Sequence, residues 1–190
     1  MSLTLVTAPT TEPVTLNELK AHARIDFSED DAYLQKCIVA ARKWIEGQTK
    51  RAVISQTWDY TIDYDWPYYD GYHRIVLPMK PVQAISASSP EVFSITYVDG
   101  NGVSQTLAQS QYTLAKNGYV VPAYNVEWPE VRCVPDAITV RFVAGASSAD
   151  EDMKQAVMIL ATHYYEMRET ASGAPRAVEA LISPYRRATF

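Results

Sequence analysis

Apolar residues recur every three or four positions near both ends of the chain, a spacing typical of amphipathic helices. Thr15 and Glu18 have the spacing of a capping box and predict a first helix that ends near Ile25. Ser28, which three acidic residues follow, predicts the cap of a second helix that fades over residues 48–51. The apolar stripe of this second helix consists of Leu34, Cys37, Ile38, Ala41, Trp44 and Ile45.

The polar face of the second helix is expected to be exposed to solvent, and its charged residues are Lys36, Arg42, Lys43 and Glu46. Ser148 and Glu151 predict a second capping box, which would begin a third long helix. Pro175 is expected to open a short last helix over residues 176–181. The apolar stripe of the third helix consists of Met153, Ala156, Val157, Leu160, Tyr164 and Met167.

Between these helical ends the apolar period changes from 3.6 to 2, which indicates β-structure. Large residues alternate with polar ones from residue 58 to residue 66, and we expect the large ones to share one face of a strand. These residues are Trp58, Tyr60, Ile62, Tyr64 and Trp66. Shorter strands, separated by prolines and by Asn-Gly turn signals, are expected at residues 74–77, 92–98, 103–107, 112–114, 119–121 and 137–143.

The switch of period and back again predicts an α+β fold. Both chain ends form a helical bundle, because packing the helices together is the simplest way to bury their apolar stripes. A small antiparallel β module is inserted between them. We expect the helical domain to comprise residues 1–52 and 146–190, and the β module to comprise residues 53–145.

The net charge of −5 and the pI of about 5.2 argue against tight DNA binding, which requires clustered Lys and Arg. Cys37 and Cys133 lie far apart in the sequence, so neither a disulfide nor a metal site is expected. Cys37 falls on an apolar stripe and is interpreted as a core residue. No apolar run has the length of a membrane span, and the N-terminus does not look like a signal peptide.

No residue set has the pattern of a catalytic centre, so we expect neither an enzyme nor a cofactor or metal. Asp59, Asp63 and Asp65 are compatible with a carboxylate pair for glycoside hydrolysis, but we favour a solvated strand face. His163 and Glu166 lie three apart on a helix, and one such pair supplies too few ligands for zinc.

Two groups of residues are candidates for partner interfaces. The aromatic face with Trp58, Tyr60, Tyr64 and Trp66 favours core or subunit packing over sugar binding or base stacking. The C-terminal Tyr185, Arg186 and Arg187 form either a docking arm or a solvated tail. The last helix has two alternatives as well: it orders only against a neighbour, or it packs on its own bundle through Val178, Leu181 and Ile182.

Several segments resemble the head–tail connector (adaptor) proteins of tailed double-stranded-DNA phages, which are often labelled DNA-packaging proteins. The resemblance covers both helical ends, about half the chain, in the order and spacing of that family. The segments are PVTLNELKAHARID at residues 13–26, DDAYL at 30–34, AARKWIE at 40–46, QTW at 56–58, VRFVAG at 140–145, YEMRE at 165–169 and AVEALISPYR at 177–186.

This resemblance implies a structural subunit of a homo-oligomeric, twelve-fold ring at the head–tail junction of the virion, assembled in the bacterial cytoplasm. The ring would lie beneath the portal protein, extend the DNA channel and dock a stopper or tail-completion protein. DNA would pass through it without sequence-specific binding, and no catalytic residue carries over. Two alternatives stay open: a DNA-packaging accessory factor that binds DNA, and a carbohydrate- or host-binding module built on the β insertion.

Overall fold

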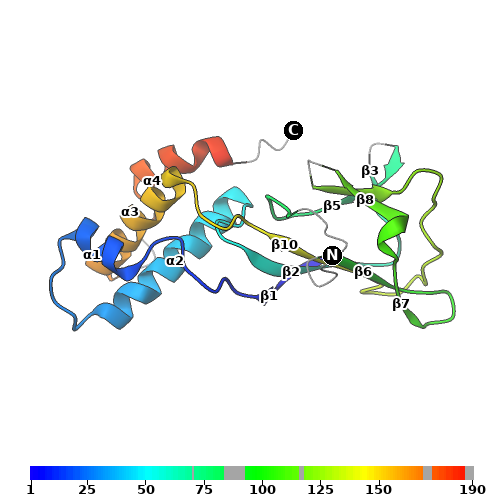
Figure 1. Ribbon diagram of the computed structural model, residues 1–190, viewed down its shortest axis with the longest axis horizontal. Helices are drawn as coiled ribbons and strands as arrows, with labels where there is room; N and C mark the ends of the chain where they lie inside the picture. Colours follow the sequence, from blue (N-terminus) through cyan, green and yellow to red (C-terminus); the bar gives the residue numbers. More distant parts are fainter. Residues whose placement is uncertain (70, 84–92, 116–117, 169–172, 187–190) are drawn as a thin grey trace. The chain divides into compact units, whose positions relative to one another are not determined.

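A computed structural model describes residues 1–69, 71–83, 93–115, 118–168 and 173–186 (Figure 1). Contacts between backbone positions divide the chain into two compact units. The β unit comprises residues 1–8 and 55–145, and the helical unit comprises residues 9–54 and 146–190. Helices and antiparallel sheets are thus segregated along the chain, which confirms the predicted α+β fold.

The helical unit is built on two long helices from opposite ends of the sequence, α2 and α3, which pack against each other. Its elements are α1 (Leu16–Ala23), α2 (Asp31–Thr49), α3 (Glu151–Met167), α4 (Arg176–Ile182) and the 3-10 turn η2 (Ser183–Tyr185). The predicted apolar stripes supply most of the core, in which Leu34, Ala41, Ile45, Ala156, Val157 and Leu160 are fully buried. Cys37 lies in this core, as expected.

Two of the four predicted helix starts, at Thr15 and Pro175, are confirmed and the other two are wrong. The Thr15 hydroxyl accepts a hydrogen bond from the amide of Glu18 at 3.2 Å, so the first capping box forms. The cap residue of α2 is Asp30 rather than Ser28, and that of α3 is Asp150 rather than Ser148. Helical hydrogen bonding starts only at these later carbonyls, and neither cap side chain bonds to the helix amides.

The β unit contains a five-stranded antiparallel sheet in the order β1-β2-β10-β6-β7. A three-stranded sheet, β5-β9-β8, and a hairpin, β3-β4, complete it. The strands are β1 (Ser2–Thr7), β2 (Gln56–Ile62), β3 (Tyr68–Tyr69), β4 (Tyr72–His73), β5 (Ile75–Val76), β6 (Phe93–Val98), β7 (Ser104–Thr106), β8 (Tyr112–Ala115), β9 (Tyr119–Pro122) and β10 (Ile138–Ala144). The 3-10 turn η1 (Gln109–Gln111) precedes β8.

The N-terminal strand β1 was not predicted, because residues 1–52 were expected to lie with the helices. It pairs with β2, from Ser2 opposite Thr61 to Thr7 opposite Thr57. The alternation of Leu3 and Leu5 with Ser and Thr is the period-two signal that indicates it.

The long aromatic strand that was predicted for residues 58–66 ends at Ile62. Ile62 pairs with Ile138, the first residue of β10, so the neighbouring strand offers no further partner on that side. Tyr64 then adopts a left-handed backbone conformation with φ 69°, and its amide donates to the carbonyl of Val134 at 3.0 Å. Tyr64 and Trp66 therefore do not continue the face of Trp58 and Tyr60, and this part of the prediction was wrong.

Candidate functional site

The three aspartates that alternate along the aromatic segment do not converge on a common site. Asp59 lies opposite Arg141 across the β2–β10 pair and accepts two hydrogen bonds from its guanidinium, at 2.8 and 2.7 Å. Asp63 accepts a hydrogen bond from the amide of Asp136 and binds the amino group of Met1. Asp65 accepts a hydrogen bond from the backbone amide of Trp66 at 2.7 Å. The three carboxylates are thus engaged by different partners.

His163 is partly buried on α3, and its ring lies 6.3 Å from that of Tyr164. Over the described ranges of the chain, no group of three His, Cys, Asp or Glu side chains is placed to hold a metal ion. Among the described helices, none combines the length and apolar character that crossing a bilayer requires.

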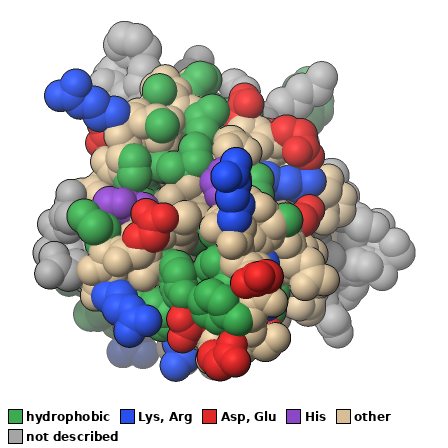
Figure 2. Space-filling model, turned by 90° about the vertical axis from the view of Figure 1, so that its left-hand side faces the viewer, with side chains coloured by type: hydrophobic (Ala, Val, Ile, Leu, Met, Phe, Trp, Pro, Cys, Tyr) green, Lys and Arg blue, Asp and Glu red, His purple; other side chains and the backbone are tan. Residues whose placement is uncertain are grey.

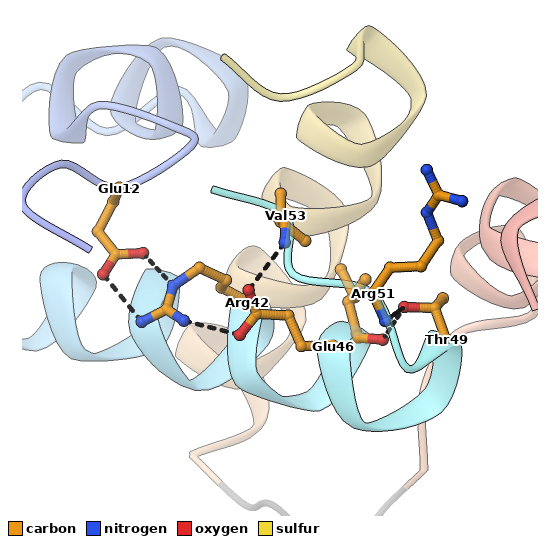
Figure 3. Close-up of polar contacts among 7 residues, drawn as sticks. Glu12, Arg42, Glu46, Thr49, Arg51 and Val53 are labelled. Carbon is orange, nitrogen blue, oxygen red and sulfur yellow. Dashed lines mark hydrogen bonds and ion pairs between the residues drawn. The ribbon is translucent and has the colours of Figure 1, made fainter. Parts of the chain in front are cut away.

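A buried ion network in the helical unit holds three segments of the chain together (Figure 3). The Arg42 guanidinium donates from Nε and Nη2 to both oxygens of Glu12, at 2.7 and 3.2 Å. It also donates from Nη1 to Glu46 at 2.8 Å. The second oxygen of Glu46 accepts from the backbone amide of Val53 at 2.9 Å. Side chains on α2 therefore bind the segment that precedes α1 and the segment that follows α2.

The network is buried, although Arg42 and Glu46 were expected on a solvent-exposed face of α2. The Arg42 side chain is 2% exposed and that of Glu46 is 7% exposed. Burial by itself lowers the pKa of the Arg42 guanidinium, but the hydrogen bonds and charges of Glu12 and Glu46 outweigh burial and raise that pKa. The i, i+4 spacing of Arg42 and Glu46 is the sequence signal for their pairing. Glu12, the other partner of Arg42, lies 30 residues earlier in the chain, and no local pattern connects it to α2.

The aromatic candidates of the β unit occupy three different environments. Trp58 and Tyr60 are partly buried on β2, and Tyr64 is 54% exposed. Trp66 is buried, with its ring stacked on that of Trp128 at 4.4 Å and 10°. Trp128, which the sequence analysis did not single out, thus completes an aromatic pair with Trp66.

Tyr185, the first of the three C-terminal candidates, packs on the helical unit to which it belongs. The last helix, α4, buries Val178 and Ile182 in the helical core. Of the two alternatives for this helix, the structure thus shows the one in which it packs on its own bundle. The Tyr185 ring lies beneath the guanidinium of Arg51, 5.5 Å from it, and its hydroxyl lies 3.5 Å from Asp152. Arg186 is exposed, and Arg187 lies outside the described residues.

The exposed surface of the helical end carries hydrophobic side chains between scattered acidic and basic ones (Figure 2). Phe27 and Met167 are large hydrophobic residues of this unit that remain 43% and 53% exposed. Lys and Arg side chains are dispersed on the face that Figure 2 shows. This distribution suits contact with other proteins better than contact with DNA phosphates.

Comparisons with known proteins agree with a structural protein of a virion. A family model described as "Head completion protein" matches residues 12–188. A chain from the "Virion of native gene transfer agent (GTA) particle" is 28% identical, covers 100% of this chain and 97% of its own length, and gives a TM-score of 0.80. A comparison with curated proteins gives no match.

Two further similar structures are described as necks of such particles. A chain from the neck of an empty GTA particle, computed with C6 symmetry, is 27% identical with a TM-score of 0.78. A chain from the neck of a native GTA particle, computed with C12 symmetry, is 28% identical with a TM-score of 0.71. Each covers 100% of this chain and 97% of its own length. The matches confirm the expected virion location, and the chain belongs to the head completion protein family.

Proposed function

We propose that this protein is a head–tail connector subunit that forms a twelve-fold ring beneath the portal of a phage-like particle. The observation that carries the proposal is the full-length similarity, at a TM-score of 0.80, to a chain of a gene transfer agent virion. The neck of such a particle has been computed with C12 symmetry, which supports the copy number. The ring extends the DNA channel and offers a platform to a stopper or tail-completion protein.

The acidic balance of the chain is compatible with this role. DNA must slide through a connector without binding to it, and a net charge of −5 disfavours stable contacts with phosphates. The protein acts through assembly contacts and not through chemistry. This is also what the separate engagement of Asp59 and Asp63 supports.

A closed ring requires two different complementary surfaces on each copy, because its contacts are head-to-tail. We assign the ring contacts to the partly buried or exposed aromatic residues of the β unit, and the portal contacts to the C-terminal end. The first group is Trp58, Tyr60 and Tyr64, with Trp66 supporting them from its buried position; the second is Tyr185, Arg186 and Arg187.

The test is a deletion of the gene in a strain that produces the particles, with the wild-type gene restored as the control. Without the protein, we expect DNA-filled heads and free tails to accumulate, as counted by electron microscopy, and transfer of DNA to cease. Reconstruction of the wild-type neck should contain twelve copies next to the portal. Normal yields of tailed particles in the deletion strain would refute the proposal.

The portal assignment is tested separately with the double variant Arg186→Ser/Arg187→Ser. Arg186 is exposed, and its side chain makes no hydrogen bond or ion pair with other described residues, so we expect unchanged thermal unfolding. Head–tail joining should fall if these charges bind the portal. The variant Lys43→Ser/Lys50→Ser removes the same charge from exposed positions of α2 and its end, and is the matched control. Equal joining by both double variants would refute the assignment.

A further inference from the structure

A cleft in the β unit lies between the end of the β2 segment and the loop that follows β9. Its volume is about 560 Å³, within the usual size of ligand sites. Aromatic, aliphatic and acidic side chains line it together: Asp65, Trp66, His73, Val126, Glu127, Trp128 and Glu130, with prolines at 122 and 129.

Hydrogen bonds hold the aromatic wall of the cleft in place. The indole of Trp66 donates to the carbonyl of Pro129 at 2.8 Å, and the indole of Trp128 donates to the carbonyl of His73 at 3.2 Å. The two indoles also stack on each other at 4.4 Å. This wall is formed before any ligand binds, which lowers the entropic cost of binding.

The charge of the cleft is negative. Glu127 and Glu130 are exposed, and across the described part of the chain neither carboxylate makes an ion pair or hydrogen bond. Asp65 accepts one hydrogen bond, from the amide of Trp66, which does not neutralise its charge. His73 is the basic side chain of the lining, and its ring lies against that of Tyr68. Such a cleft repels phosphates and attracts cations.

We propose that this cleft binds a Lys- or Arg-bearing segment of a protein that adjoins the ring. Arginine fits both features, because its planar guanidinium stacks on aromatic faces and forms paired hydrogen bonds with carboxylates. The aliphatic stem packs on Val126 and the prolines while the charge reaches Glu127 and Glu130. Tyr124, which is 93% exposed and belongs to the same loop, supplies an aromatic contact beside the cleft.

This inference rests on the proposed function in one respect: the ring must adjoin another protein that carries the basic segment. Binding itself is tested with the isolated full-length chain. The probes are acetylated tripeptide amides, Ala-Arg-Ala and Ala-Lys-Ala, with Ala-Glu-Ala as the charge-reversed probe. Titration is followed by tryptophan fluorescence and by calorimetry. We expect saturable binding of the Arg and Lys peptides, with no binding of the Glu peptide.

The double variant Glu127→Gln/Glu130→Gln should weaken binding of the Arg peptide about tenfold, since two charge contacts are lost. The control Asp26→Asn/Glu179→Gln changes the net charge equally at exposed positions of the helical unit and should bind as the wild type does. The variants preserve side-chain size, and thermal unfolding verifies that each is folded.

Absence of peptide binding, or equal weakening by both double variants, would overturn the inference. Saturable binding of a neutral oligosaccharide without any response to the basic peptides would overturn it in favour of a sugar site. A neck that assembles normally with the Glu127→Gln/Glu130→Gln variant, despite lost peptide binding, refutes the role of the cleft in the ring and leaves the connector function standing. Failure of the gene deletion to block tail joining refutes the connector function instead.

Discussion

The carboxylate of Glu46 accepts a hydrogen bond from the backbone amide of Val53, seven residues later, at 2.9 Å. Its other oxygen binds Arg42, which also binds Glu12. The last residues of α2 are thereby joined to the segment that leads out of the helical unit. The network therefore binds the segment before α1 and the segment after α2 to side chains of α2.

We expect Arg42→Met to lower the free energy of unfolding by about 3–5 kcal/mol, because it leaves the buried Glu46 without its cationic partner. Urea denaturation followed by circular dichroism measures this loss. Lys43→Met, at the exposed neighbouring position of α2, is the control and should change stability by roughly 0.5 kcal/mol or less. A loss below about 1 kcal/mol for Arg42→Met would show that the network is not required for stability.

The pair of Asp59 and Arg141 should contribute much less. Its geometry is bidentate, but the Arg141 side chain is 45% exposed, so solvent screens the attraction. We expect a coupling energy of roughly 1 kcal/mol or less from a double-mutant cycle with Asp59→Asn and Arg141→Gln. Added salt should lower this coupling energy further, because salt screens exposed charges. A coupling energy as large as that of a buried ion pair would show that exposure to solvent does not weaken the pair of Asp59 and Arg141.

The two thiols should differ in reactivity. Cys37 is buried, and burial raises the pKa of its thiol, so the reactive thiolate is scarce. Cys133 is exposed. Titration with a chromogenic disulfide reagent should detect one thiol in the native protein and two after denaturation. Rapid labelling of native Cys133→Ser protein would disprove the burial of Cys37.

The capping box of α1 should add a pH dependence to stability. The hydrogen bonds from the side chain and amide of Thr15 lower the pKa of Glu18 below its ordinary value of 4.5. The stabilising effect of the ionised carboxylate is therefore fully present above that value and lost as the pH falls through the lowered pKa.

The measurement is the thermal midpoint of the wild type and of Glu18→Gln at a series of pH values. Because Glu18 lies at the surface, the difference should be small near neutral pH. It should shrink as the carboxylate becomes protonated, since both side chains are then neutral. A difference that grows towards acid pH would contradict the lowered pKa.

Features that depend on a few neighbouring positions were predictable from the sequence. The apolar stripes of α2 and α3, the burial of Cys37 and the Thr15–Glu18 cap all follow from spacing within one or two helical turns. The resemblance of both chain ends to connector proteins predicted a structural protein of a virion. The match to the head completion protein family agrees with that class of protein.

Local patterns failed at some element ends, where the backbone hydrogen bonds begin or stop at a residue other than the one the side-chain spacing indicates. Ser148 and Glu151 have the spacing of a capping box, yet α3 begins after Asp150. The alternation of aromatic residues continues to Trp66, yet β2 ends where β10 begins to pair with it at Ile62. Backbone hydrogen bonds to a partner strand, and not the side-chain pattern alone, set the length of a strand.

The sequence by itself determined the long helices, their apolar stripes and the change to extended segments between them, because helix and strand periods are local properties of the backbone. Only the tertiary structure decided that Arg42 is buried, that Ser2–Thr7 joins the sheet and that Trp66 stacks on Trp128. Each of these depends on residues that lie far apart in the chain. Their contacts arise when apolar surfaces pack and the polar groups caught between them must find partners.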